Sequence, residues 1–166
     1  MNADEIIEWI YRSTGSHCRT GAMLDRLVGV DTPTFWQVFL DLWNVCDDTW
    51  EHRADLLATL RSHSLIAPAI KYMTGADRAF ASSLPEPIKV WRGCCRERVR
   101  GLAWTTDRAV AERFARGHRG IPVPDPVVAE ATIARAGVFF VSTERKESEI
   151  VLDPRWLIRV KVEPSP

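Results

Sequence analysis

The hydrophobic and polar positions change their period part-way along the chain. Up to about residue 84 the apolar side chains recur every three or four residues, as on one face of a helix, whereas beyond it they alternate in short runs, as in strands. Pro85 and Pro87 mark the change. The pattern predicts an α+β protein of one domain, with a helical part at residues 1–84 and a mainly antiparallel β part at residues 85–166 that includes one helix.

Capping signals place the helices of the first part. Asp31, with Pro33 two positions later, predicts the start of one helix. Asp48 and Glu51 stand at the spacing of a capping box and predict the start of another. The inward side chains of this second helix would be Ala54, Leu57 and Leu60. Residues 12–31 are less regular.

The β part is expected to hold six short strands around its one helix. The strands are predicted at residues 88–91, 102–105, 127–133, 137–141, 149–152 and 157–162. Asp107 is a suitable cap for the helix, along which Val110 and Phe114 follow. The glycines at 117 and 120 predict where that helix stops.

The amino-acid composition indicates a globular protein. The chain has 166 residues, of which 46% are hydrophobic and 27% charged, so disordered, collagen-like and coiled-coil proteins are excluded. Apolar runs are short, which predicts no membrane span, and the acidic start at residues 1–5 predicts no signal peptide. The four cysteines lack the spacing of metal ligands. We therefore expect a cytoplasmic protein with reduced cysteines and no metal.

Charge is unevenly distributed along the chain. The net formal charge is zero, but residues 88–120 contain nine basic and three acidic side chains, most of the basic ones arginines. Such an arginine-rich stretch can attract a phosphate-bearing ligand, from a dinucleotide to RNA. It can equally be a solvated face that is paired with nearby acids, and charge alone leaves both interpretations open.

Two short motifs in this stretch carry candidate chemistry. Arg92 ends a predicted strand, where its guanidinium offers a fork of donors suited to phosphate, and Gly93 would let a ligand approach the backbone. Thr105 and Thr106 end the next strand, where hydroxyls can orient a carboxylate or hold a sugar hydroxyl. Each motif alone also fits an ordinary structural role, as an exposed arginine and a strand-to-helix turn.

A third motif places two carboxylates close together. Glu147 and Glu149 are two residues apart, so on a strand they would point to the same face beside the apolar run at 150–152. Like charges at that spacing repel and do not stabilise a fold. The pair suggests a cationic or electron-poor partner, while two solvent-facing acids on an edge strand remain the structural alternative.

Together, and in this order, the three motifs resemble the mono-ADP-ribosyltransferases of the R-S-E class, the group that includes arginine-modifying bacterial toxins and vertebrate ecto-enzymes. The resemblance covers about residues 88–153. It implies a two-sheet ADP-ribosyltransferase-like β core with an inserted helix. It also implies NAD as the ADP-ribose donor, with no metal.

The resemblance assigns the central roles to four residues. Arg92 would hold the phosphate or ribose of NAD, with the backbone of Gly93 near the nicotinamide amide. Glu149 would be the catalytic glutamate, and Glu147 the one associated with a guanidinium acceptor. The preceding loop at 142–146 would recognise the target.

One position departs from the family pattern. Thr105 would stand for the last residue of the family's Ser-Thr-Ser element, but the first serine falls on Ala103. That serine helps to orient the catalytic glutamate, so Thr105 or Thr106 would have to supply the contact. Trp104 and Phe114 would be available to stack on the rings of NAD, although a core position is the alternative for each.

The implied function is an NAD-dependent mono-ADP-ribosyltransferase that modifies a macromolecule. The Glu-x-Glu pattern favours a protein arginine as acceptor, and the arginines and tryptophans also allow RNA or DNA. Such a protein would act as an intracellular toxin or phage effector, with a neutralising antitoxin protein as partner and no membrane contact. Two alternatives remain: an NAD glycohydrolase that uses water as acceptor, and a non-catalytic NAD-, RNA- or partner-binding module.

Overall fold

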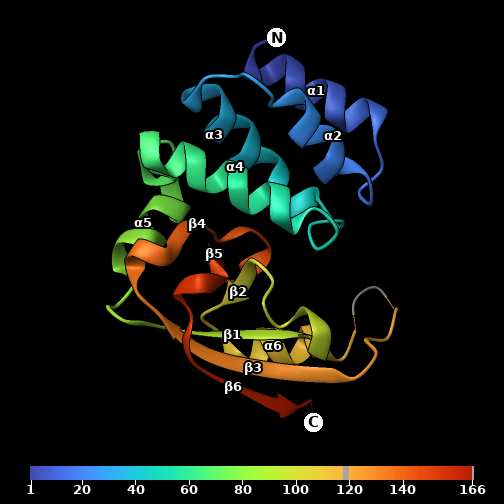
Figure 1. Cartoon of the computed structure of the whole chain (residues 1–166), viewed down its shortest axis with the longest axis vertical. Helices are drawn as coiled ribbons and strands as arrows, with labels where there is room; N and C mark the ends of the chain where they lie inside the picture. Colours follow the sequence, from blue (N-terminus) through green and yellow to red (C-terminus); the bar gives the residue numbers. More distant parts are fainter. Residues whose placement is uncertain (118–119, 166) are drawn as a thin grey trace. The chain divides into compact units, whose positions relative to one another are not determined.

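The chain divides into two compact units, Met1–Met73 and Thr74–Pro166 (Figure 1). The structure is a computed structural model that describes residues 1–117 and 120–165. The division lies before the predicted boundary at Pro85, so helix α5 (Gly75–Ser83) belongs to the strand-containing unit and not to the helical part. Among the described helices, none is both long and apolar enough to cross a bilayer.

Four α-helices build the first unit. They are α1 (Ala3–Ser13), α2 (Arg19–Arg26), α3 (Thr32–Leu42) and α4 (Arg53–Ile66), with short 3-10 turns η1 at Trp43–Val45 and η2 at Ala69–Lys71. Helix α3 is a core element, because its apolar side chains Phe35, Trp36 and Phe39 are completely buried. The indole of Trp36 donates a hydrogen bond to the carbonyl of Ala67 at 2.9 Å.

One of the two capping predictions for this unit is confirmed, and the other is wrong. Asp31 caps α3, since its carboxylate accepts a hydrogen bond from the amide of Thr34 at 2.8 Å. Helix α4 instead begins at Arg53 without a side-chain cap, and its buried leucines are Leu56 and Leu60, while Ala54 is exposed.

Asp48 has a different role from the predicted cap of α4. Its buried carboxylate accepts a hydrogen bond from the amide of Thr20 at 3.0 Å, near the start of α2. Helix α2 was not expected from the sequence, and the first residue before it, Cys18, makes no side-chain cap. An acid far along the chain therefore supplies the acceptor that the local sequence lacks.

The surroundings of one histidine in this unit predict a pH-dependent stability. His63 stacks on Phe35 with ring centroids 3.8 Å apart, and its Nδ1 lies 3.0 Å from the hydroxyl of Thr32. Burial lowers the pKa of His63 from its ordinary value. The unfolded chain therefore binds the proton more tightly, so the unfolding free energy falls as the pH drops below about 6.5.

We expect the unfolding free energy to fall less between pH 7.5 and pH 5.5 in His63→Gln than in the wild type. Denaturant unfolding of both proteins at both pH values measures this difference. His17→Gln, at an exposed position, is the matched control. An equal pH dependence in His63→Gln and the wild type would show that His63 titrates alike in the folded and unfolded chains.

The second unit contains one antiparallel sheet. Its strands are β1 (Ile88–Cys95), β2 (Ala103–Thr105), β3 (Pro126–Ile133), β4 (Val138–Ser142), β5 (Glu149–Leu152) and β6 (Ile158–Pro164), in the order β4-β5-β2-β1-β3-β6. The predicted α+β class is confirmed. The expectation of two sheets is not, because the described strands hydrogen-bond into a single sheet.

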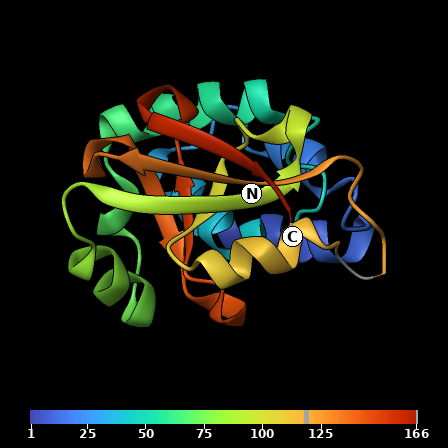
Figure 2. The ribbon, with the colours of Figure 1, turned by 90° about the horizontal axis from the view of Figure 1, so that it is seen from below.

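The sheet is nevertheless unevenly connected. Every residue of β1 pairs with one of β3, whereas β1 and β2 are joined at one residue pair, Trp91 with Thr105. Two three-stranded halves, β4-β5-β2 and β1-β3-β6, therefore meet at a narrow junction. Helix α6 (Arg108–Ala115) lies along β1 and β3 (Figure 2). As predicted, the carboxylate of Asp107 caps α6 by accepting from the amide of Ala109 at 2.9 Å.

The predicted stop of this helix at residues 117–120 is described only in part. Helix α6 ends at Ala115, and Gly117 has a φ of 115°, in the region that favours glycine. His118 and Arg119 lie outside the described residues.

Candidate functional site

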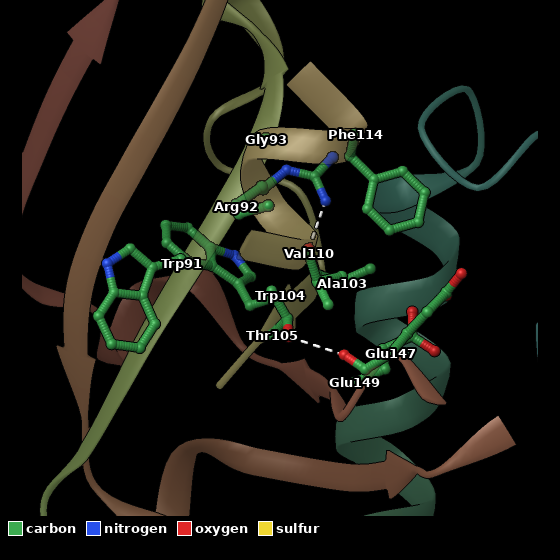
Figure 3. A pocket seen from close by; sticks show the side chains of 11 residues that line it. Trp91, Arg92, Gly93, Ala103, Trp104, Thr105, Val110, Phe114, Glu147 and Glu149 are labelled. Carbon is green, nitrogen blue, oxygen red and sulfur yellow. Dashed lines mark hydrogen bonds between the residues drawn. The ribbon is translucent and has the colours of Figure 1, made fainter. Parts of the chain in front are cut away.

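A pocket of about 230 Å³ at the narrow junction of the sheet gathers most of the candidate residues. Arg92, Gly93 and Phe114 come from β1 and α6, Trp104 and Thr105 from β2, and Glu147 and Glu149 from the segment that enters β5. Figure 3 shows the two glutamates across the pocket from Arg92. Thr106 does not line the pocket; its amide donates to the carbonyl of Ser148 at 3.2 Å.

Arg92 is held by the backbone around it. Its Nε donates to the carbonyl of Arg98 at 3.0 Å, and its Nη1 donates to the carbonyl of Ala103. Gly101 makes room for this arrangement, since a Cβ there would lie 2.4 Å from Nη2 of Arg92. The guanidinium therefore ties β1 to the approach of β2 and is fixed in direction at the pocket wall.

This double contact predicts an effect of Arg92→Lys on stability. A lysine ammonium is a compact charge without the planar fork, so it cannot reproduce both hydrogen bonds. We expect the unfolding free energy to fall by about 1–3 kcal/mol, as measured by denaturant unfolding without ligand. Arg113→Lys, at an exposed position of α6, is the matched control. Equal stability of Arg92→Lys and the control would contradict the structural part of this role.

Gly93 has a packing role that differs from the expected one. A Cβ at this position would lie 1.7 Å from the carbonyl oxygen of Ala111 and 2.7 Å from the amide nitrogen of Ala115. The space that the missing side chain leaves is thus filled by the backbone of α6, and not by an approaching ligand. Gly93 still lines the pocket. Its tight contact with α6 also brings Phe114 of that helix to the pocket.

Glu147 and Glu149 both line the pocket, but not for the reason that the sequence suggested. Strand β5 begins at Glu149, while Glu147 follows the 3-10 turn η5 (Glu144–Lys146). Between them Ser148 has a φ of 46°, so the alternation of a strand does not apply. The carboxylates are brought together by a turn.

This turn is conformationally unusual. Arg145 and Lys146 also have positive φ values, 59° and 56°. Residues with a side chain avoid this region, at a cost of about 1–3 kcal/mol each. Such a cost persists only where surrounding contacts fix the backbone, and it is found most often at functional sites.

Thr105 supplies one of those contacts. Its buried hydroxyl donates to the carbonyl of Glu147 at 2.7 Å and accepts from the amide of Asp107 at 3.0 Å. The donor of Thr105 is therefore directed at the protein backbone, in place of the ligand contact expected from the sequence. Ala103 lines the pocket without a hydroxyl.

The two aromatic candidates differ in their surroundings. Trp104 is 2% exposed, and its indole donates to the carbonyl of Gly101 at 2.9 Å. It is therefore a core residue that also lines the pocket. Phe114 is half-buried at the pocket edge, across from Glu147 (Figure 3). Of the two, Phe114 is the less buried, and stacking on a ligand needs an accessible ring.

Several arginines of the basic stretch have structural partners. Arg96 forms an ion pair with Asp125 at 2.9 Å, and Arg108 forms pairs with Glu112 at 2.9 Å and Glu163 at 3.3 Å. These contacts support the interpretation of a surface paired with acids for this part of the stretch.

Burial raises the pKa of the Cys94 thiol, although the guanidinium of Arg92 opposes the shift. The raised pKa disfavours a reactive thiolate at Cys94.

Within residues 1–117 and 120–165, no group of three or more histidine, cysteine, aspartate or glutamate side chains is arranged to hold a metal ion. Comparisons of the chain with protein-family models, curated proteins and solved structures find no match. The residues of the pocket are therefore the basis for a candidate function.

Proposed function

We propose that this protein is an NAD-dependent mono-ADP-ribosyltransferase whose active site is the pocket between Arg92 and the two glutamates. The observation that carries the proposal is that Arg92 lines one pocket with Glu147 and Glu149, which lie far from it in the sequence, and with Phe114. A cation, two carboxylates and an aromatic ring are the groups that binding and cleaving a nicotinamide dinucleotide would use.

The reaction breaks the bond between C1′ of the ribose and the nicotinamide nitrogen, and the bonding electron pair leaves with nicotinamide. Positive charge builds on the ribose in the transition state. A carboxylate at Glu149 would stabilise this charge. Because the charge is absent from the ground state, the stabilisation would lower the barrier of the reaction. An acceptor nucleophile then bonds to C1′ and gives up its proton, for which Glu147 is the available base.

The size of the pocket limits which part of NAD it can enclose. Its volume of about 230 Å³ lies below the range of about 300–1,000 Å³ that is typical for sites enclosing drug-sized ligands. We assign the enclosed part to nicotinamide and its ribose, which must lie near the glutamates for the reaction. The phosphates would then lie toward Arg92, outside the deepest part, where charge-assisted hydrogen bonds hold them.

Protein arginine is the acceptor that the site favours. Glu147 provides a second carboxylate beside Glu149, and a carboxylate binds a guanidinium through two parallel hydrogen bonds. A nucleic-acid acceptor would need a continuous cationic surface, but Arg96 and Arg108 of the basic stretch are already paired with acids.

Transfer from labelled NAD tests the proposal. The purified protein is incubated with labelled NAD and a cell extract, and the label in macromolecules is then treated with protease or nuclease. We expect label that protease releases. Label that only nuclease releases would indicate a nucleic-acid acceptor, and free ADP-ribose alone would indicate a glycohydrolase. A folded protein that neither binds nor cleaves NAD would overturn the proposal in favour of a binding module.

A further inference from the structure

The segment Thr143–Ser148 joins β4 to β5 and carries Glu147 immediately before the strand that begins at Glu149. Three of its residues, Arg145, Lys146 and Ser148, have φ values between 46° and 59°. Side chains disfavour this backbone conformation, so the segment needs contacts from elsewhere to keep its shape. Two such contacts stand at its ends, and they come from different elements.

The first contact is made by Asp77 on helix α5. A single carboxylate oxygen of Asp77, Oδ1, accepts hydrogen bonds from both the amide and the hydroxyl of Thr143, each at 2.7 Å. These short distances are typical of charge-assisted hydrogen bonds. Asp77 does not line the pocket, and no feature of its surrounding sequence indicates this contact. It fixes the start of the segment.

The second contact is made at the end of β2. The hydroxyl of Thr105 donates to the carbonyl of Glu147 at 2.7 Å, and the amide of the next residue, Thr106, donates to the carbonyl of Ser148 at 3.2 Å. The amide of Asp107 donates to the Thr105 hydroxyl at 3.0 Å and so orients its proton toward Glu147. Thr105 is buried, which keeps water from competing for this bond.

We propose that Asp77 and Thr105 are positioning residues that hold the segment Thr143–Ser148 at its two ends and thereby set where Glu147 and Glu149 lie in the pocket. The effect on turnover rests on the proposed transferase function, whereas the effect on the segment does not. Neither residue needs to touch the reacting atoms. Asp77 acts through Thr143, and Thr105 acts through the backbone of Glu147.

The test compares four variants in two measurements. Asp77→Ala and Thr105→Val each remove one contact, Thr105→Ser keeps the hydroxyl, and Ser82→Ala is the control, because Ser82 is exposed on the same helix as Asp77 and bonds within that helix. The first measurement is backbone hydrogen exchange of the peptide that spans residues 143–149. The second is the separate determination of kcat and KM for nicotinamide release from NAD.

We expect faster exchange of residues 143–149 in Asp77→Ala and Thr105→Val, with unchanged exchange in β1 and β3. We also expect kcat to fall about 10- to 100-fold in both variants, because small displacements of a reacting group cost that much. The KM should stay near the wild-type value, since Arg92 and Phe114 remain in place. Thr105→Ser and Ser82→Ala should match the wild type in both measurements.

The outcomes separate this inference from the proposed function. A wild type that releases no nicotinamide, with faster exchange in the two variants, would overturn the transferase but leave the positioning role in place. Wild-type exchange at residues 143–149 in Asp77→Ala and Thr105→Val would overturn the positioning role whatever the activity. A global increase in exchange would do the same, because it would show that the two residues stabilise the whole unit.

Discussion

Glu149→Gln is expected to slow the release of nicotinamide from NAD by about 10²–10³-fold, the usual loss when one electrostatic stabiliser of a transition state is removed. Glutamine has nearly the same size and shape as glutamate, so the pocket and the fold should persist. It lacks the negative charge that would stabilise the developing positive charge on the ribose. The measurement is the rate of nicotinamide release under single-turnover conditions, with NAD affinity determined separately by calorimetry.

The expected pattern is a large loss in rate with an NAD affinity within a few-fold of the wild type, because Glu149 would act in the transition state more than in the bound ground state. Glu97→Gln is the matched control, since Glu97 is an exposed carboxylate of the same unit outside the pocket, and it should keep the wild-type rate. Normal turnover by Glu149→Gln would remove this residue from the reaction.

Gly93→Ala is expected to have the largest effect on stability. The added Cβ would overlap the carbonyl oxygen of Ala111 at 1.7 Å, which is backbone inside α6 and has no flexible side chain to move aside. Overpacking of this kind costs typically about 1–3 kcal/mol and occasionally more, and contact with backbone places this variant at the upper end. For a unit of this size the melting temperature should fall by roughly 10 °C or more.

Thermal denaturation followed by circular dichroism measures this effect. Gly15→Ala is the control, because a Cβ there would meet its nearest atoms, in His17, at an ordinary 3.8 Å. We expect it to change the melting temperature by only a few degrees. If Gly93→Ala has the same melting temperature as the control, α6 does not pack closely on β1, and the place of Phe114 at the pocket would have to be reconsidered.

The parts of the fold that were predictable depend on neighbours in the sequence. Asp31 caps α3 through a residue three positions away, and the apolar face of that helix repeats along its length, so both were visible in the pattern. Helix α2 was missed because Asp48, which accepts from its first turn, lies 28 residues away. The single sheet likewise depends on one residue pair, Trp91 with Thr105, which no local sequence pattern predicts.

The candidate site shows the same division. The pattern identified Arg92, Glu147 and Glu149, and all three line one pocket. The explanation for the glutamates was wrong, since β5 begins only at Glu149 and Ser148 has a positive φ. The explanation for Gly93 was also wrong, since α6 occupies the space beside it. Hydroxyl and carboxylate contacts over long sequence distances, such as that of Asp77 with Thr143, have no sequence signature and required the structure.

A crystal structure of the Glu149→Gln variant with NAD tests the central claim most directly, because the slow variant would keep the dinucleotide intact. We expect nicotinamide and its ribose in the pocket, with C1′ facing the side chain at position 149 and the phosphates toward Arg92. NAD bound elsewhere on the protein, or no NAD bound at millimolar concentration, would contradict it.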